Sequence, residues 1–232
     1  MKGPLPFVFS NFAMTADGKI AFASDHFEPF GSPRDREHMM ELRATADAVM
    51  SGARTVEPDG VKLGTGGAKY RQLRRRRGLT EHNLRIIVSG AGSVDPHADI
   101  FQHRFSPIIV LTSRRASEKR LRSLRAVADD VAAFGAGRVD FDAAFRWLRA
   151  KWKVRRLLCE GGGELHGALV AAGLVDELHL TVCPTIFGGR NAPTLADGEG
   201  LQRLADAKRF RLKSFERVGE EIFTVWRHFR GR

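Results

Sequence analysis

Short apolar runs alternate along the chain with segments in which apolar residues recur every three or four positions. Runs of four to eight residues, bounded by Gly, Pro, Ser or charged residues, are typical of buried β-strands. The segment from Asp140 to Lys151 has helical spacing instead, because its apolar residues fall on one face. The apolar runs span residues 7–12, 48–50, 84–88, 107–111, 129–134, 154–159 and 178–183.

Helix boundaries follow from capping residues. Ser32-Pro33 combines an N-cap residue with a proline at the first helical position, and Asp35 completes a weak capping box. Gly173 suits the position just after a helix end. The predicted helices span residues 33–44, 117–128, 140–151 and 164–172.

The remaining segments decide the fold class. Residues 61–82 are rich in Gly and Arg and lack a period, which predicts a long surface loop with room for a helical piece. Residues 210–216 and 222–229 predict an antiparallel hairpin turned at Gly219-Glu220. The whole pattern predicts an α/β fold: a mixed, mostly parallel central sheet flanked by helices, with a C-terminal antiparallel hairpin. A chain of 232 residues fits one domain, residues 1–232.

Charge points to anionic partners. The formal net charge is +11, from 38 basic and 27 acidic residues, which favours phosphorylated small molecules or nucleic acid. The run Arg74 to Arg77 has three interpretations: a solvated basic loop, a nucleic-acid patch, or a contact to a substrate or cofactor phosphate. Because the run lacks interleaved aromatic residues, nucleic-acid binding is disfavoured.

Other features exclude whole classes of function. Cys159 and Cys183 lie in apolar runs, so we expect reduced core thiols and a cytoplasmic protein. The triplet His26-Phe27-Glu28 matches half of a zinc deaminase motif, but no P-C-x-x-C follows, so no metal site is expected. No apolar run reaches the roughly 18 residues of a membrane helix. P-loop, G-x-S-x-G and triad motifs are absent.

The turn Glu160-Gly161-Gly162-Gly163, between a predicted strand and a predicted helix, is the most informative stretch. Unpaired N–H groups at a helix start bind phosphate, and glycines let a pyrophosphate approach the backbone. The spacing is not that of the dinucleotide fingerprint G-x-G-x-x-G, and the turn is equally compatible with a merely tight connection. We therefore regard it as a candidate cofactor turn.

Two further strand ends strengthen this hypothesis. One turn follows residues 48–50 and presents Arg54 and Thr55, although Thr55 is equally suited to cap a helix. Another follows residues 84–88 at Ser89-Gly90. In an open parallel sheet, ligands lie beyond the carboxyl ends of the strands, so these turns are expected to converge on one crevice. Anion-binding turns without a nucleophile motif favour a hydride-transfer enzyme, in which the cofactor carries the chemistry.

The segment from Met14 to Ala21 resembles the S-x-D-G-K signature of the riboflavin-biosynthesis reductase family. That family forms the C-terminal domain of the bifunctional riboflavin deaminase–reductase and has a dihydrofolate-reductase-like fold. Further similar blocks are Leu42-Arg43, Asp47 to Met50, Gly52, Thr55-Val56, Glu160 to Gly163, Gly173 to Leu178 and Pro184 to Gly189. The resemblance extends over about residues 7 to 229.

The resemblance implies a homodimeric, NADPH-dependent reductase that converts the ribosyl group of an aminopyrimidine 5′-phosphate to ribityl. Arg43 and Glu160 match substrate-contacting positions, with Arg43 a candidate for the phosphate and Glu160 for the sugar hydroxyls. A reductase of the same fold acting on another pyrimidine, a pterin or a carbonyl compound is the alternative. From the turns and the resemblance together, the candidate NADPH-contacting residues are Ala13, Arg54, Thr55, Asp59, Ser89, Gly90, Gly161, Gly162, Gly163, Glu164, Leu165, His166, Gly167 and Ala168.

The residues also leave simpler interpretations open. Arg43 is equally an exposed helix-end residue, and Glu160 equally a carboxylate that caps nearby N–H groups. The chain departs from the family where Phe27 and Pro29 replace a usual Ser and Trp, and where residues 57–60 read E-P-D-G instead of A-D-D-P. A family arginine that binds substrate phosphate falls near Gly66, so Lys62 or Arg71 are candidates to replace it.

Overall fold

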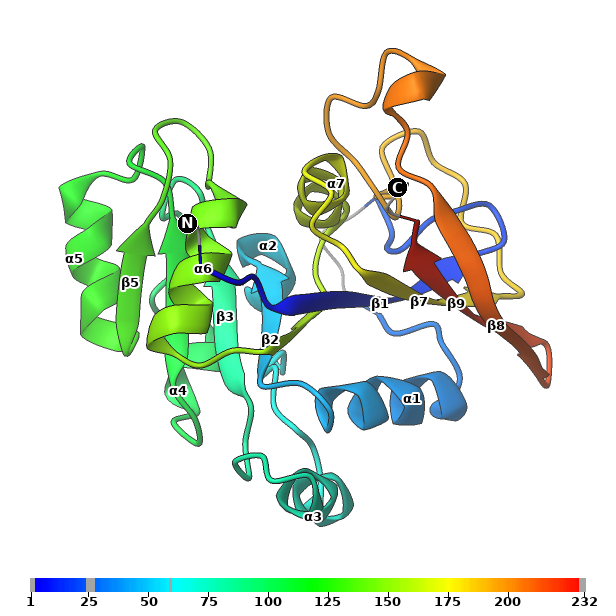
Figure 1. Cartoon of the computed structure of the whole chain (residues 1–232), viewed down its shortest axis with the longest axis horizontal. Helices are drawn as coiled ribbons and strands as arrows, with labels where there is room; N and C mark the ends of the chain where they lie inside the picture. The colour runs from blue at the N-terminus through cyan, green and yellow to red at the C-terminus, as the bar shows by residue number, and fades with distance from the viewer. Residues whose placement is uncertain (1–2, 24–27, 59, 230–232) are drawn as a thin grey trace. The chain divides into compact units, whose positions relative to one another are not determined.

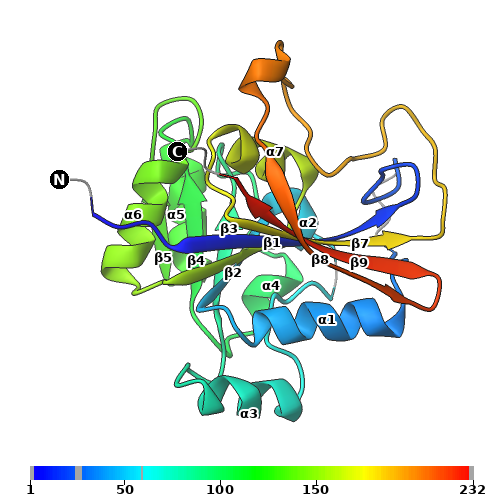
Figure 2. The ribbon, with the colours of Figure 1, turned by 45° about the vertical axis from the view of Figure 1, so that its right-hand side comes forward.

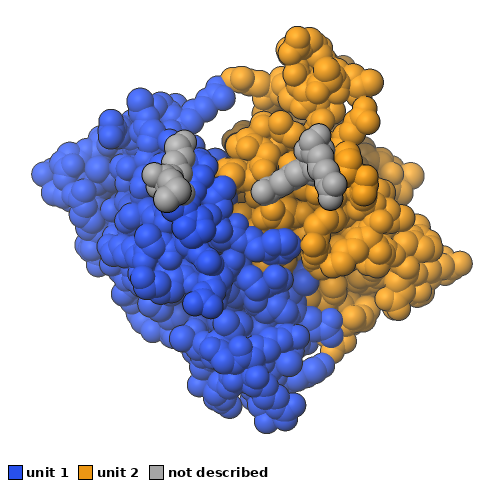
Figure 3. Space-filling model, in the orientation of Figure 1, with its two compact units in different colours: residues 1–7, 40–161 blue, residues 8–39, 162–232 orange. Residues whose placement is uncertain are grey.

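The computed structural model describes residues 3–23, 28–58 and 60–229. Contacts divide the chain into two compact units, distinguished by colour in Figure 3. Unit 1 comprises residues 1–7 and 40–161, and unit 2 comprises residues 8–39 and 162–232. Each unit is therefore built from separate stretches of sequence. The prediction that residues 1–232 form one domain stays a prediction.

Unit 1 contains a parallel sheet in the order β5-β4-β3-β2-β6. Its helices α5 and α6 are drawn beside β4 and β5 (Figure 1). The central strands are mostly apolar; for example, Val49, Ile86 and Leu158 are completely buried. The strands are β2 (Ala48–Gly52), β3 (Leu84–Val88), β4 (Ile108–Thr112), β5 (Asp130–Ala133) and β6 (Arg156–Cys159). The helices are α2 (Ala53–Val56), α3 (Ala68–Arg76), α4 (Asp99–Gln102), α5 (Glu118–Val127) and α6 (Phe141–Lys151).

Unit 2 contains strands in the order β1-β7-β9-β8. Strands β1 (Phe7–Thr15) and β7 (Glu177–Cys183) are parallel, whereas β8 (Phe210–Val218) and β9 (Glu221–His228) form an antiparallel hairpin. Helices α1 (Pro33–Arg43) and α7 (Gly163–Ala171) lie on opposite faces of β1 and β7 (Figures 1 and 2). A short 3-10 turn, η1 (Leu204–Asp206), precedes the hairpin.

Local sequence signals set the helix ends as predicted. At the start of α1, the Asp35 amide donates to Ser32 Oγ at 3.2 Å. The Ser32 amide in turn donates to Glu221 Oε1 at 2.7 Å, so Glu221 of β9 supplies the return bond of the capping box. Gly173 adopts a φ of +67° just after α7, a conformation that glycine reaches without steric cost.

The predicted strands, the four predicted helices and the C-terminal hairpin are all confirmed, and with them the α/β fold class with a mostly parallel sheet. The predicted loop at residues 61–82 contains a nine-residue helix, α3. The interpretation of Arg74 to Arg77 as one solvated basic loop is wrong for Arg74, whose side chain is completely buried. Four-residue helices α2 and α4 were not predicted, because a single turn carries no periodic signal.

Two classes of feature are absent from the part of the chain that the structure describes. No helix there has the length and apolar character needed to cross a membrane. No cluster of three or more His, Cys, Asp or Glu side chains suited to a metal ion occurs there either. Both cysteines are buried free thiols; the metal half-motif at residues 26–28 lies partly outside the described residues.

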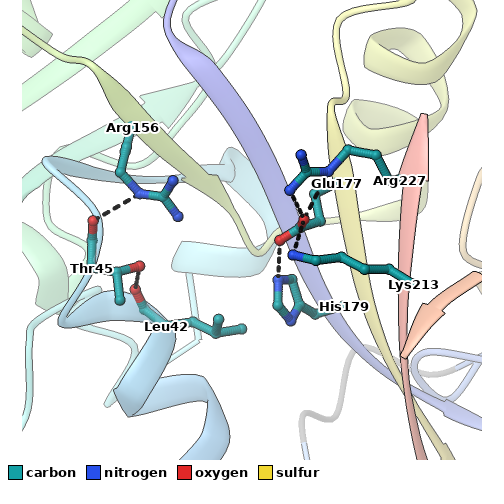
Figure 4. A network of polar contacts seen from close by, with 7 residues as sticks. All are labelled: Leu42, Thr45, Arg156, Glu177, His179, Lys213 and Arg227. Atoms are coloured by element: carbon teal, nitrogen blue, oxygen red, sulfur yellow. Dashed lines mark hydrogen bonds and ion pairs between the residues drawn. The ribbon is translucent and has the colours of Figure 1, made fainter. Parts of the chain in front are cut away.

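A buried carboxylate joins three strands of unit 2. Glu177 of β7 accepts hydrogen bonds from Arg227 Nε at 3.0 Å, Lys213 Nζ at 3.1 Å and the His179 ring at 3.0 Å (Figure 4). Burial alone raises the pKa of the Glu177 carboxyl, but the hydrogen bonds from Arg227 and Lys213 outweigh it and lower the pKa to about 2. The charged form of Glu177 therefore stabilises this unit.

We expect the network to make unfolding depend on pH in a defined window. Because the pKa of Glu177 falls from 4.5 to about 2 on folding, its stabilisation is complete above pH 4.5 and is lost as the pH falls toward 2. Urea unfolding of wild type and Glu177→Gln should give a difference in unfolding free energy that shrinks across this window. Glu216→Gln on the exposed strand β8 is the control; a Glu177→Gln difference that does not change with pH would contradict the prediction.

Candidate functional site

Three strand ends of unit 1 meet at one edge of its sheet. Strands β3, β2 and β6 are parallel neighbours, so the residues that follow them lie side by side at their carboxyl ends. These residues are Ser89 after β3, Ala53 after Gly52 of β2, and Glu160 after β6. The three strand ends are therefore neighbours within unit 1, and their convergence on one ligand crevice stays a prediction.

An ion pair dominates this edge. Arg43, the last residue of α1, donates from Nε to Glu160 Oε1 at 2.8 Å and from Nη2 to Glu160 Oε2 at 2.6 Å. Its Nη1 donates to the Gly64 carbonyl at 2.7 Å. The Glu160 amide donates to the Met50 carbonyl at 2.9 Å, which fixes the carboxylate to the end of β2. Both side chains are about nine-tenths buried.

The ion pair leaves hydrogen-bond donors and acceptors that a ligand can use. A guanidinium has five N–H groups, and the three bonds of Arg43 leave one donor on each terminal nitrogen. Each Glu160 oxygen accepts one bond and retains a lone pair. The pair can thus bind a hydroxyl and a phosphate oxygen together. Arg43 is not exposed, and Glu160 is bound by a side chain rather than by backbone amides, so both simpler interpretations are wrong.

Each glycine of the turn after Glu160 has its own structural requirement. A Cβ on Gly161 would lie 1.9 Å from Ser51 Oγ and 2.8 Å from the Gly52 nitrogen. Gly162 has a φ of +50° and a ψ of 136°, outside the region that other residues adopt easily. A Cβ on Gly163 would lie 2.3 Å from the Thr194 carbonyl oxygen. Close packing within the protein therefore explains two of the three glycines.

Helix α7 begins at this turn and has nine residues. Its N-cap residue is Gly162, which has no side chain to cap the helix, and the first helical backbone bond runs from His166 to Gly162 at 3.0 Å. The nearby carboxylate of Asp197 is already engaged, since it accepts from Thr194 Oγ1 at 2.5 Å and from the Thr194 amide. Glu164 in the first turn and the Asp197 carboxylate beside Gly163 both lie near the positive end of the α7 dipole and partly offset it.

His166 faces the interior of unit 2. Its Nδ1 lies 2.8 Å from the Leu195 carbonyl oxygen, which accepts only, so Nδ1 carries the hydrogen. Its Nε2 then accepts from Ser10 Oγ at 3.1 Å. Burial lowers the pKa of His166, so the ring is neutral at physiological pH. Its side chain joins α7 to β1 and to the segment around Leu195, rather than facing solvent.

The other predicted cofactor residues are distributed over both units. Ser89 is buried, and its Oγ accepts from the Ser93 and Val94 amides at 2.8 and 3.2 Å. Arg54 and Thr55 lie in α2, and Ala13 is half-buried on β1. In α7, Leu165 is buried, Gly167 packs against Asp197, and Glu164 and Ala168 are exposed. Asp59 lies outside the described residues.

Two arginines at the end of β4 were missed by the sequence reasoning. Ser113 donates from Oγ to the Gly90 carbonyl at 2.7 Å and from its amide at 3.0 Å, which places the following Arg114 and Arg115 next to the turn after β3. Both arginines are exposed. Of the expected replacements for the family arginine, Arg71 is bound to Glu81 and to the Gly66 carbonyl, whereas Lys62 is exposed.

The segment that carries the family signature forms a clamp. Asp17 accepts from Thr15 Oγ1 at 2.6 Å and from the amides of Phe187 and Gly188 at 3.1 and 2.7 Å. The hydrogen bond from Thr15 is the main cause that lowers the Asp17 pKa. The motif thus holds the loop after β7, which explains why an acidic residue and a glycine stand together there.

Comparison with known proteins identifies the family. The sequence pattern of the RibD C-terminal domain matches residues 6–224. The 2,5-diamino-6-ribosylamino-4(3H)-pyrimidinone 5′-phosphate reductase of Archaeoglobus fulgidus is 36% identical over 215 residues, which cover 93% of this chain and 94% of that protein. The chain belongs to the RibD C-terminal domain family, as the resemblance predicted.

Solved structures agree with this fold. A pyrimidine reductase-like protein of Corynebacterium diphtheriae superposes with a TM-score of 0.81 at 21% identity, covering 97% of this chain and 93% of its own. A diaminohydroxyphosphoribosylaminopyrimidine deaminase/5-amino-6-(5-phosphoribosylamino)uracil reductase of Thermotoga maritima gives a TM-score of 0.72 at 20% identity. The superposition covers 97% of this chain and 57% of the Thermotoga protein.

Proposed function

We propose that this chain is a reductase that converts the ribosyl group of a ribosylaminopyrimidine 5′-phosphate to a ribityl group, with NADPH as cofactor. Membership of the family supports a reductase with a nicotinamide cofactor. The observation that carries the substrate assignment is the buried Arg43–Glu160 pair, whose remaining donors and acceptors suit a phosphorylated sugar. Substrates of other kinds, such as a pterin or a simple carbonyl compound, are the alternative.

The chain's own residues position the reactants. When bound, NADPH supplies a hydride to C1′ of the open-chain, imine-like sugar. The free lone pairs of Glu160 accept hydrogen bonds from sugar hydroxyls, and the free N–H groups of Arg43 donate to an anionic oxygen. The backbone N–H groups at the start of α7, where the N-cap residue is a glycine, suit the cofactor pyrophosphate. Solvent supplies the proton that completes the reduction.

The ring of the substrate has two candidate forms. The Archaeoglobus relative is named for a 2,5-diaminopyrimidinone, and the Thermotoga protein for a 5-aminouracil, so the two rings differ in an amino or an oxo group at C2. We favour the diaminopyrimidinone, because the relative named for it is 36% identical over nearly its whole length.

Turnover of both pyrimidines tests this assignment. We expect oxidation of NADPH with either ribosylaminopyrimidine 5′-phosphate and a higher kcat/KM for the diaminopyrimidinone, measured by absorbance at 340 nm. The dephosphorylated nucleoside analogues are the control for recognition of the phosphate. If neither pyrimidine is turned over but a pterin or carbonyl compound is, the alternative substrate class is correct.

The charge at position 162 tests the pyrophosphate site. Asn and Asp tolerate a positive φ similarly, so Gly162→Asn and Gly162→Asp carry the same backbone strain and differ in charge. We expect Gly162→Asp to bind NADPH at least about tenfold more weakly than Gly162→Asn, because its carboxylate repels the pyrophosphate. Calorimetric titration measures both affinities, and equal values would place the pyrophosphate elsewhere.

Selection of NADPH over NADH needs a cation for the 2′-phosphate. Arg114 and Arg115 are exposed beside the Ser89-Gly90 turn, to which Ser113 connects them. Arginine binds phosphate through paired N–H donors, and such charge-assisted bonds are stronger than neutral ones. These two arginines are the proposed contacts to the 2′-phosphate, with Ser89 and Gly90 beside it.

Neutral variants test this specificity. We expect Arg114→Gln and Arg115→Gln together to weaken NADPH binding about tenfold and to leave NADH binding unchanged, since only NADPH carries the 2′-phosphate. Arg76→Gln on α3 removes the same type of charge from the basic run and is the control. If NADPH affinity falls in Arg76→Gln and stays unchanged in the variant with Arg114→Gln and Arg115→Gln, the basic run is favoured as the phosphate contact.

Two further expectations belong to the same proposal. The resemblance implies a homodimer, and the long edge strand β8 presents exposed apolar side chains at Leu212 and Phe215 that suit a contact between two copies. The two buried free thiols, Cys159 and Cys183, are compatible with the expected cytoplasmic location.

A further inference from the structure

We infer that Arg74 is a positioning residue that fixes the end of α1 and so keeps Arg43 engaged with Glu160. The part of this inference that concerns substrate rests on the proposed function. Arg74 lies on α3 in the run of four arginines, yet it is one of the largest fully buried side chains. Its neighbours Arg75 to Arg77 are exposed, so this one residue has a separate role.

The guanidinium of Arg74 binds three backbone carbonyls. Its Nη1 donates to the Arg43 carbonyl at 2.8 Å and to the Ala46 carbonyl, and its Nε donates to the Thr80 carbonyl at 2.8 Å. Burial lowers the pKa of Arg74 to about 10, which still leaves it charged at neutral pH. The hydrogen bonds of this buried cation therefore all go to backbone carbonyls, and the charge of Asp47 also favours its charged form.

The carbonyls at the end of a helix need partners outside the helix. At the end of α1, the Leu42 carbonyl accepts from Thr45 Oγ1 at 2.8 Å, and the Thr45 carbonyl accepts from Arg156 Nε at 3.2 Å (Figure 4). The Arg43 carbonyl accepts from Arg74 Nη1 at 2.8 Å and, over a longer distance, from the Ala46 amide at 3.3 Å. A cation there also complements the negative end of the helix dipole.

Both the backbone and the side chain of Arg43 are therefore held by hydrogen bonds. Arg74 fixes its backbone carbonyl, while Glu160 and the Gly64 carbonyl hold its guanidinium. A bidentate pair requires two aligned bonds, so a small shift of the Arg43 backbone weakens both. Because Glu160 is fixed independently through the Met50 carbonyl, Arg74 acts on the Arg43 side of the pair.

Lysine cannot reproduce this geometry. Arg74 reaches the Thr80 carbonyl from Nε and the Arg43 and Ala46 carbonyls from Nη1, so its donors are spread over the guanidinium. A lysine places three donors on a single nitrogen and keeps only the charge. Arg74→Lys therefore preserves the charge and loses part of the anchoring.

Arg85 on β3 offers a matched control. It is also fully buried, burial lowers its pKa to about 10, and its guanidinium binds the Ile100 carbonyl at 3.1 Å and the Ser106 carbonyl. Its hydrogen bonds go to Ile100 and Ser106 and do not reach the segment from Arg43 to Ala46. Arg85→Lys removes a comparable buried guanidinium that makes no hydrogen bond to the end of α1.

A measurement without substrate tests the positioning role directly. Double-mutant cycles of Arg43→Gln and Glu160→Gln in urea unfolding give the coupling of the pair in wild-type, Arg74→Lys and Arg85→Lys backgrounds. We expect the coupling, as a ratio of unfolding constants, to fall about tenfold in Arg74→Lys. It should be unchanged in Arg85→Lys. Unchanged coupling in Arg74→Lys would overturn the inference.

Hydrogen exchange in wild type covers the case in which Arg74→Lys does not fold. In increasing sub-denaturing urea, the Nε–H groups of Arg43 and Arg74 should lose protection from exchange together, because a single local opening would break the hydrogen bonds of both residues. The Nε–H of Arg85 should lose protection at a different urea concentration. Independent loss of protection by Arg43 and Arg74 would overturn the inference.

Kinetics then connect the positioning to substrate. We expect Arg74→Lys to raise KM for the ribosylaminopyrimidine 5′-phosphate about tenfold, with the Kd for NADPH unchanged, and Arg85→Lys to change neither. Equal changes in both variants would mean that lost stability alone accounts for the effect, which would overturn the role toward substrate. If wild type does not turn over the pyrimidine, the proposed function fails, while the coupling measurement still decides the role of Arg74.

Discussion

The ion pair between Arg43 and Glu160 is the interaction on which the candidate site depends. It joins the end of α1 to the end of β6, two segments separated by 117 residues in sequence. Removing either partner would leave a buried charge unpaired, which is strongly destabilising. The segments that meet at the pair also include the loop at Gly64, so the pair determines where the polar groups of this sheet edge lie.

The three glycines of the turn after Glu160 are needed for two structural reasons, close packing and a positive φ. Gly161 and Gly163 are required because Ser51 and Thr194 pack directly against them, and Gly162 is required by its positive φ. The same backbone also leaves the first turn of α7 without a capping side chain. Close packing and anion binding therefore favour the same residues, so a glycine-rich turn does not by itself distinguish a tight connection from a cofactor site.

Most of the fold follows from the sequence, and the site follows only in part. Strands such as Leu84–Val88 and helices such as Phe141–Lys151 can be predicted from the sequence, because their apolar patterns are local. The inward orientation of His166 depends on Ser10 and Leu195, which are distant in sequence, so no local pattern indicates it. The pairing of Arg43 with Glu160 was likewise hidden, although each residue was singled out.

The run of four arginines is the clearest case in which composition misleads. A charge run is usually solvated, and Arg75 to Arg77 are exposed as that rule predicts. Arg74 differs because α3 directs it toward the carbonyls of Arg43, Ala46 and Thr80. An apolar residue would fill the space but remove a hydrogen bond from each of these carbonyls, and a buried carbonyl left unsatisfied costs about 1–3 kcal/mol. The helical period of α3 therefore separates one structural arginine from three exposed ones, and only knowledge of what α3 packs against identifies which.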